Sequence, residues 1–161
     1  DVVSGVANAA MPLAGGAFTG AVTTNSTIDG RDVAADGVLA TNALPKAGGT
    51  MTGAVIGSTD TDASNTGNVT LDFSANQNFV LTLQGATTLV NPSTETVGQS
   101  GFITFIQDGT GGRTVALGTD YETAGAAGIT LSTAASATDI VPYVVVAANR
   151  ILLGTPQLAF A

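Results

Sequence analysis

The chain has 161 residues, of which only 10% are charged, and twelve acidic against four basic residues give it a net charge of −8. It contains neither cysteine nor histidine, which excludes disulfides, thiolate nucleophiles, Cys/His zinc sites and mechanisms that need an imidazole. The acidic balance opposes nucleic acid as a partner, and no apolar run is long enough for insertion into a membrane.

A repeated unit occupies the N-terminal third of the chain. Residues 11–22 (MPLAGGAFTGAV) return as residues 44–55 (LPKAGGTMTGAV), and each copy carries a proline and a glycine pair. Two copies are too few for a solenoid, which needs about three to bury its core, so we interpret them as pieces of a rod. Phe18 and Met51 are bulky apolar residues among small neighbours. The same residues of symmetry-related chains would cover them.

Between the two copies, residues 27–44 predict a turn followed by a short helix that Pro45 ends. Its apolar residues have roughly helical spacing, and we expect this stripe to pack against copies of itself around a trimer axis. The alternative is a surface helix that folds onto the C-terminal domain. The candidate trimer-axis residues are therefore Phe18, Val33, Val38, Leu39, Leu44 and Met51.

Two strings in this part carry a resemblance to a known family. Residues 45–54 (PKAGGTMTGA) and 29–37 (DGRDVAADG) resemble repeat elements of tail fibre and related virion fibre (spike) proteins of tailed bacteriophages, including fibres of phage-derived particles such as gene transfer agents. The resemblance implies a parallel homotrimer with an elongated shaft. It also implies exposure on the surface of a virion or phage-like particle, attached to other fibre, tail or head proteins.

A polar stretch separates the repeats from the rest of the chain. Residues 57–65 (GSTDTDASN) contain almost nothing to bury, and we interpret them as a linker or exposed loop. The predicted organisation is a shaft over residues 1–56, this linker, and a globular β-domain over residues 66–161. Two aspartates and an asparagine in the linker superficially suggest a calcium loop, but the terminal bidentate Glu is missing. We expect neither a metal ion nor a cofactor.

The remainder alternates strand-like runs with turn signals, as abundant threonine, valine and glycine favour. Apolar residues alternate over Val69–Phe73 and Phe79–Leu83, and residues 102–106 are apolar on both faces, which predicts a central strand covered on each side. Later runs bring the expected total to about eight strands. The fold class that we predict is mainly β, with an antiparallel β-sandwich or jelly-roll-like domain after the shaft.

Three strings of this half, residues 78–83 (NFVLTL), 98–101 (GQSG) and 107–114 (QDGTGGRT), resemble a β-rich domain of phage fibres and other phage structural proteins. Such domains are similar whether they serve as caps, folding heads or adhesive tips, so the resemblance leaves the role open. Asp108 and Arg113 flank the glycine-rich turn of the third string. It lacks the ending of a phosphate-binding loop, and we expect an Asp–Arg pair across a hairpin turn.

One local cluster, Asp120–Tyr121–Glu122, combines acids with an aromatic residue. In a sugar-contacting loop, Tyr121 would stack on a pyranose ring and the carboxylates would accept hydrogen bonds from hydroxyls; the other reading is an ordinary polar turn. Tyr143 is a further candidate contact, or else a core or edge aromatic. We expect a non-enzymatic structural and adhesive fibre component that contacts host-surface polysaccharide. The alternatives are a purely structural connector, trimerisation or head-decoration segment, and a polysaccharide depolymerase tailspike fragment.

Overall fold

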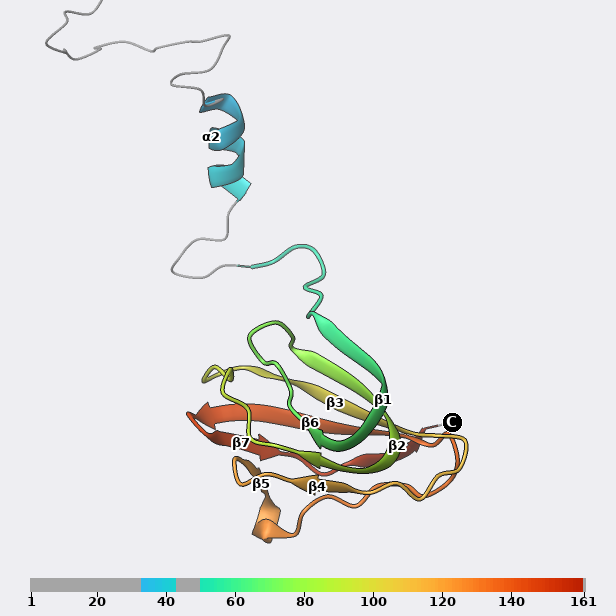
Figure 1. Cartoon of the computed structure of the whole chain (residues 1–161). Helices are drawn as coiled ribbons and strands as arrows, with labels where there is room; N and C mark the ends of the chain where they lie inside the picture. Colours follow the sequence, from blue (N-terminus) through green and yellow to red (C-terminus); the bar gives the residue numbers. More distant parts are fainter. Residues whose placement is uncertain (1–32, 43–49, 161) are drawn as a thin grey trace, which may run out of the picture. The chain divides into compact units, whose positions relative to one another are not determined.

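Figure 1 shows the computed structural model of the chain, in which residues 33–42 and 50–160 are described. It divides into two compact units, Asp1–Gly53 and Ala54–Ala161. In the first unit, α2 (Val33–Asn42) confirms the helix expected between the two repeat copies. Within the described part of the chain, no helix is long and apolar enough to cross a membrane.

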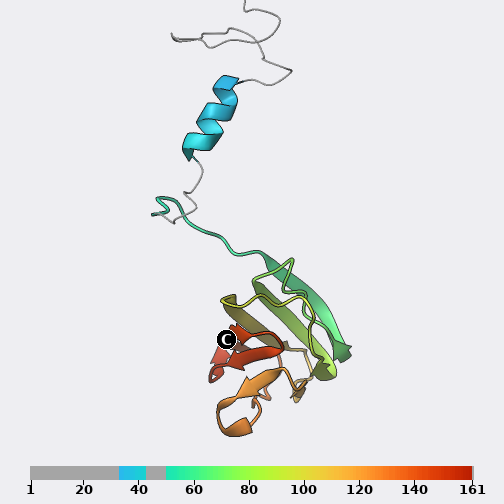
Figure 2. The same cartoon turned by 90° about the vertical axis from the view of Figure 1, so that its left-hand side faces the viewer.

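The second unit is a β-domain with one short 3-10 helix, η1 (Ala124–Ala126). Its strands form a single mixed sheet in the order β1-β2-β3-β6-β7-β5, and β4 pairs with β2 while β8 pairs with β6. Figure 2 shows that the sheet is strongly curled. The strands are β1 (Thr59–Val69), β2 (Asn78–Leu89), β3 (Ser100–Gln107), β4 (Val115–Leu117), β5 (Tyr121–Thr123), β6 (Thr138–Ala147), β7 (Arg150–Leu153) and β8 (Gln157–Phe160).

The expectation of an antiparallel sandwich or jelly roll is wrong in strand direction. Strand β2 runs parallel to β1, β3 and β4, and β5 runs parallel to β7, whereas β6 is antiparallel to β3, β7 and β8. The described strands also form one sheet instead of the two of a sandwich. Side-chain alternation identifies the residues that share a face, but it carries no information on strand direction.

The connection over residues 70–77 explains how β1 and β2 become parallel. Leu71 and Phe73, which the alternation placed in a strand, are buried in this connection. The Phe73 ring lies 5.0 Å from that of Phe79 and 5.2 Å from that of Tyr143, between centroids. The side-chain amide of Gln99 donates to the Phe73 carbonyl at 2.9 Å. The connection therefore crosses the inner face of the sheet and covers it in place of a second sheet.

Alternate residues of the central strands build the core on this inner face. In β3, Ile103 and Phe105 are buried, whereas Phe102 on the other face is 53% exposed. Residues 102–106 were predicted to form a strand covered on both faces. Within the described residues, β3 is covered on its inner face only. The remaining buried apolar side chains of the sheet are Phe79, Leu81, Leu83, Leu89, Tyr121, Val141, Tyr143, Val145, Ile151 and Leu153.

The predicted linker over residues 57–65 is wrong, because β1 begins at Thr59 and pairs with β2. Strand β1 lies at the edge of the sheet and is exposed along most of its length, so it needs no apolar alternation. Asp60 and Asp62 stand opposite the core residues Phe79 and Leu81. Both aspartates are exposed, and charged side chains on an edge strand oppose pairing with a further strand. The structure shows no cluster of metal-binding side chains within residues 33–42 and 50–160.

Candidate functional site

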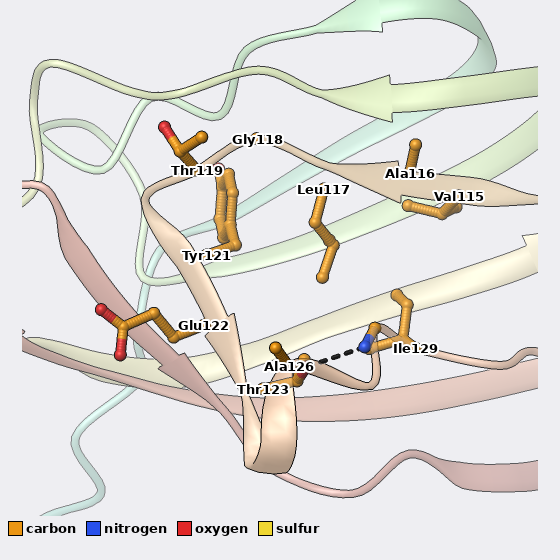
Figure 3. A pocket seen from close by; sticks show the side chains of 11 residues that line it. Val115, Ala116, Leu117, Gly118, Thr119, Tyr121, Glu122, Thr123, Ala126 and Ile129 are labelled. Carbon is orange, nitrogen blue, oxygen red and sulfur yellow. Dashed lines mark hydrogen bonds between the residues drawn. The ribbon is translucent and has the colours of Figure 1, made fainter.

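A hollow of about 620 Å³ lies between β4 and the segment formed by β5, η1 and the following loop. Figure 3 shows it at close range, with the two walls facing each other. The Thr123 hydroxyl accepts a hydrogen bond of 2.9 Å from the Gly128 amide, which closes the loop after η1. We call this hollow, lined by residues between Val115 and Ile129, the β4–β5 slot.

Both apolar and polar groups line the slot. Figure 3 shows the side chains of Leu117 and Ile129 facing the hollow, with Tyr121 beside them, whereas Thr119 and Glu122 point away from it. Leu117 and Ile129 also pack against the core as half-buried residues. A hollow that combines apolar side chains with hydrogen-bonding groups can hold a small molecule.

Tyr121 forms a wall of the slot and is itself part of the core, with 5% of its surface exposed. Its burial, with smaller effects of the nearby Glu95 and Asp120 carboxylates, raises the pKa of the phenol well above its usual value. The hydroxyl is buried without a hydrogen-bond partner. In this conformation the ring is not open for a sugar to stack flat on it from solvent.

Asp120 and Glu122 flank Tyr121 and have different surroundings. Asp120 is buried, and its amide donates to the Asn91 side-chain oxygen at 3.1 Å. Glu122 is open to solvent and accepts two hydrogen bonds from Arg150, at 2.8 Å from Nε and 3.0 Å from Nη2. The hydrogen bond from Arg150 lowers the pKa of Glu122. Glu122 is thus an ionised acceptor at the rim of the slot.

Tyr143 is a core aromatic in the structure and does not line the slot. Its hydroxyl donates to the Gln77 carbonyl at 2.7 Å, and its ring meets that of Phe73 edge-on. Burial raises the pKa of Tyr143 to about 12. The four predicted sugar-contact residues therefore do not form one open surface, and Glu122 is the member that a ligand can reach directly.

The candidate trimer-axis residues fall in the first unit. Phe18 and Leu44 lie outside the described residues. Val33, Val38 and Leu39 lie in α2, and Met51 follows the helix. Val38 and Met51 are both exposed in the single chain, so their packing against further copies stays a prediction.

The glycine-rich turn after β3 contains the expected pair. Arg113 Nη2 lies 2.7 Å from Asp108 Oδ2. The Gln107 side chain donates to the Arg113 carbonyl at 3.0 Å and accepts from its amide at 2.8 Å. The turn leads into β4, which pairs with β2, so it is not the hairpin turn that the sequence predicted. These contacts are internal to the turn, which gives the motif a structural role.

We expect Asp108→Asn to reduce the acid sensitivity of the fold. The hydrogen bond from Arg113, with those from the Gly111 and Thr110 amides, lowers the pKa of Asp108 from 3.8 to about 2. Because the folded-state pKa is depressed, the carboxylate stabilises the fold above its unfolded pKa, and this contribution is lost as the pH falls towards about 2. Thermal unfolding followed from pH 6 down to pH 2 should show a shallower decline for Asp108→Asn and for Arg113→Gln. Declines as steep as that of the wild type would contradict the assignment.

Comparison with known families identifies the domain. A family model described as "Putative phage tail fibre C-terminal domain" matches residues 65–147, which is more than half of the chain. The chain belongs to this family. The match begins within β1 and ends with β6, so the tail-fibre domain coincides with most of the β-domain. No curated protein and no solved structure matches the chain.

Membership of the family confirms the resemblance stated from the sequence. A tail fibre domain is a structural component of a phage fibre, which gives the chain a virion location and association with other tail proteins. The motifs behind the resemblance hold the tail-fibre domain together. Asn78 accepts a hydrogen bond from the Phe102 amide at 3.2 Å. Gly101 leaves room for the Gln77 carbonyl, where a Cβ would collide.

The apolar lining of the slot was missed by sequence reasoning. The sequence gives no reason to place Val115, Leu117, Ala126 or Ile129 at a site, because each is unremarkable in its own segment. A signal was present nearby, since the glycines of residues 124–128 (AGAAG) allow the positive φ angles found at Gly125 and Gly128. That run folds the chain back over the end of β5 and encloses the hollow of the tail-fibre domain.

Proposed function

We propose that the chain is a non-enzymatic structural and adhesive component of a phage or phage-like fibre. In this proposal residues 1–56 form the shaft of a homotrimer, and the tail-fibre domain contacts host-surface carbohydrate at the β4–β5 slot. The slot is the observation that carries the adhesive role. It places the Leu117 and Ile129 side chains next to hydrogen-bonding groups, and its volume of about 620 Å³ is that of a small-molecule site.

The chemistry of the slot suits a sugar better than a charged ligand. The Leu117 and Ile129 side chains would contact the apolar C–H face of a pyranose. The Glu122–Arg150 pair, which lies outside the hollow beside its rim, would bind hydroxyls of a sugar chain that extends out of the slot. One such site binds weakly, and three copies on one fibre would convert weak contacts into avidity.

Polysaccharide cleavage is the less favoured alternative. Glycoside hydrolysis usually needs two carboxylates about 5 to 10 Å apart, one of them a proton donor. Glu122 is the one carboxylate among the residues that line the slot, and its lowered pKa keeps it ionised. This supports a binding role over a depolymerase. A pure connector is the other alternative, and it predicts no binding to host envelopes.

A bulky residue in the slot should strongly reduce adhesion without affecting the fold. Ala126 lines the slot and is exposed, so Ala126→Trp should fill it and reduce binding to host cells by about ten-fold or more, since every copy loses its site. Ala75→Trp is the matched control, because Ala75 is exposed in the 70–77 connection, away from the slot. Binding is measured with fluorescently labelled protein on whole cells. No binding by folded wild type, or equal binding by all three proteins, would contradict the proposal.

A further inference from the structure

Two open strand edges border the β4–β5 slot. Within the described part of the chain, β4 pairs with β2 alone and β5 pairs with β7 alone. Neither β2 nor β7 contributes a residue to the lining of the slot, whereas both β4 and β5 do. The slot therefore lies on the sides of β4 and β5 that no neighbouring strand covers. Such an edge presents N–H and C=O groups that pair with no other strand.

The register of β4 shows which of its backbone groups are free. The Gly118 amide donates to the Leu89 carbonyl of β2 at 2.7 Å. Since the backbone groups of successive residues in a strand point alternately to its two sides, Gly118 and Ala116 face β2. The N–H and C=O groups of Val115 and Leu117 therefore point to the other side, where β4 borders the slot.

The wall opposite β4 also presents free backbone groups. Figure 3 shows Ile129, on the loop after η1, across the hollow from Leu117. Among the described residues, no backbone hydrogen bond involves residues 129–131. The Gly128 amide just before them is already held by the Thr123 hydroxyl. Both walls of the slot therefore hold N–H and C=O groups that are available to a ligand.

A secondary amide matches these two walls better than a hydroxyl group does. The C=O and N–H of a trans amide lie in one plane and point in opposite directions. One amide between two strand edges can therefore accept from one wall and donate to the other, as a peptide unit does inside a sheet. Sugars with an acetamido group at carbon 2 carry such an amide. Its methyl group would contact the Leu117 and Ile129 side chains, which face the hollow.

The short edges favour a single amide over an extended peptide. A peptide that adds to a sheet edge gains its affinity from a run of main-chain hydrogen bonds, but β4 and β5 have three residues each. The charges agree with a neutral ligand. Glu122 is the one charged residue in the lining of the slot, and it is already paired with Arg150.

We propose that the β4–β5 slot recognises 2-acetamido sugars through their amide group, which bonds to the backbone of β4 on one side and to that of residues 129–131 on the other. The inference rests on the proposed function, because it names the class of sugar that the slot takes. Since backbone groups make the polar contacts, the side chains of Val115 and Leu117 need only be apolar. This agrees with a site that has no charged motif in the sequence.

Matched sugars test the inference on the full chain. Chitotriose and cellotriose share one linkage and differ at carbon 2, where chitotriose has an acetamido group and cellotriose a hydroxyl. N-acetylgalactosamine with galactose, and N-acetylmannosamine with mannose, give two further pairs. The acetamido member of at least one pair should bind about ten-fold or more tightly, because its twin leaves both walls without their partner. Equal or absent binding in all three pairs would overturn the inference.

Amide chemical shifts of the ¹⁵N-labelled chain give these affinities and also locate the contact. The amides of Val115 and Leu117 should shift more than that of Ala116, which faces β2. Shifts confined to residues outside the slot would rule out the proposed contact, even if an acetamido sugar is preferred. This readout uses the wild-type protein and needs no variant to fold.

A backbone substitution tests the contact from the side of the protein. Val115→Pro removes an N–H that bonds to no strand, and proline is tolerated at such edge positions. It should weaken binding of the preferred acetamido sugar about ten-fold, towards that of its hydroxyl twin. Val115→Ala is the matched control, because it shortens the same side chain and keeps the N–H. If both folded variants bind like the wild type, the backbone of β4 does not bind the amide.

The remaining outcomes separate this inference from the adhesive role. Cell binding that Ala126→Trp reduces, without a preference for acetamido sugars, would overturn the inference and leave the adhesive role intact. Acetamido sugars that bind at the slot of a protein that binds no cells would support the inference and contradict adhesion. A peptide control, acetyl-trialanine amide, should bind more weakly than the preferred sugar. Equal or tighter binding of this peptide would show that the slot takes a strand and not a sugar.

Discussion

Replacing Phe79 with alanine should lower the free energy of unfolding by about 3–5 kcal/mol, the usual cost of removing a fully buried phenylalanine. Phe79 lies in β2 with none of its surface exposed. Its ring centroid is 5.0 Å from that of Phe73 and 6.4 Å from that of Tyr143. The ring therefore joins the 70–77 connection to the sheet and packs against β6. Its loss would leave a cavity where the crossover meets the inner face.

The measurement is urea unfolding followed by circular dichroism, with Phe160→Ala as the matched control. Phe160 is a phenylalanine in β8, but half of its surface is exposed, so its truncation should cost much less. Equal losses in the two variants would contradict the assignment of Phe79 to the centre of the core. A change in the slope of the denaturant dependence would instead show that the compactness of the unfolded or native state, or two-state unfolding itself, had changed.

The core face of the domain could be predicted from the sequence, and the strand directions could not. Phe79, Leu81 and Leu83 alternate in the sequence and are all buried on one face, because alternation in a strand is a local property. Parallel pairing of β1 with β2 depends on the path of residues 70–77 across the sheet. That path is fixed by contacts such as Gln99 to the Phe73 carbonyl, between residues far apart in the sequence.

The edge strand β1 could not be predicted from the sequence either, because few of its residues are apolar. Strand β1 is mostly polar because its position at the edge gives it little to bury. A polar strand has the composition of a loop, so residues 57–65 were assigned to a linker. The pairing of Asp60 with Phe79 becomes visible only when the neighbouring strand is in place.

Some contacts of the candidate site could be predicted from the sequence, and others could not. The Asp108–Arg113 pair could be predicted, since both residues flank one glycine-rich turn. The Glu122–Arg150 pair could not, because it depends on the pairing of β5 with β7. Burial of Tyr121 follows from the same pairing, in which Tyr121 stands opposite the core residue Ile151. The three neighbours in the sequence therefore have different surroundings in the structure: Tyr121 lines the slot, Asp120 is buried, and Glu122 is open to solvent.

We expect Asp139→Ala to destabilise the domain by about 2–4 kcal/mol, because it removes a buried carboxylate that satisfies several donors. Asp139 is 1% exposed in β6. Its oxygens accept from the Ser132 amide and hydroxyl, both at 2.7 Å, and from the Ala159 amide at 2.8 Å. One side chain therefore fastens the loop before β6 and strand β8 to the sheet, and its loss leaves their donors without an acceptor.

Two readouts separate this role from a general loss of packing. Urea unfolding should show the loss of stability, and hydrogen exchange should show faster exchange at Ala159 than at core amides of β2. Asp139→Asn retains one acceptor oxygen and should recover part of both effects. Asp72→Ala is the matched control, since the Asp72 carboxylate also accepts from an amide and a hydroxyl, those of Ser74, but at an exposed turn where water can replace it. If Asp139→Ala and Asp72→Ala unfold alike, Asp139 does not anchor β8.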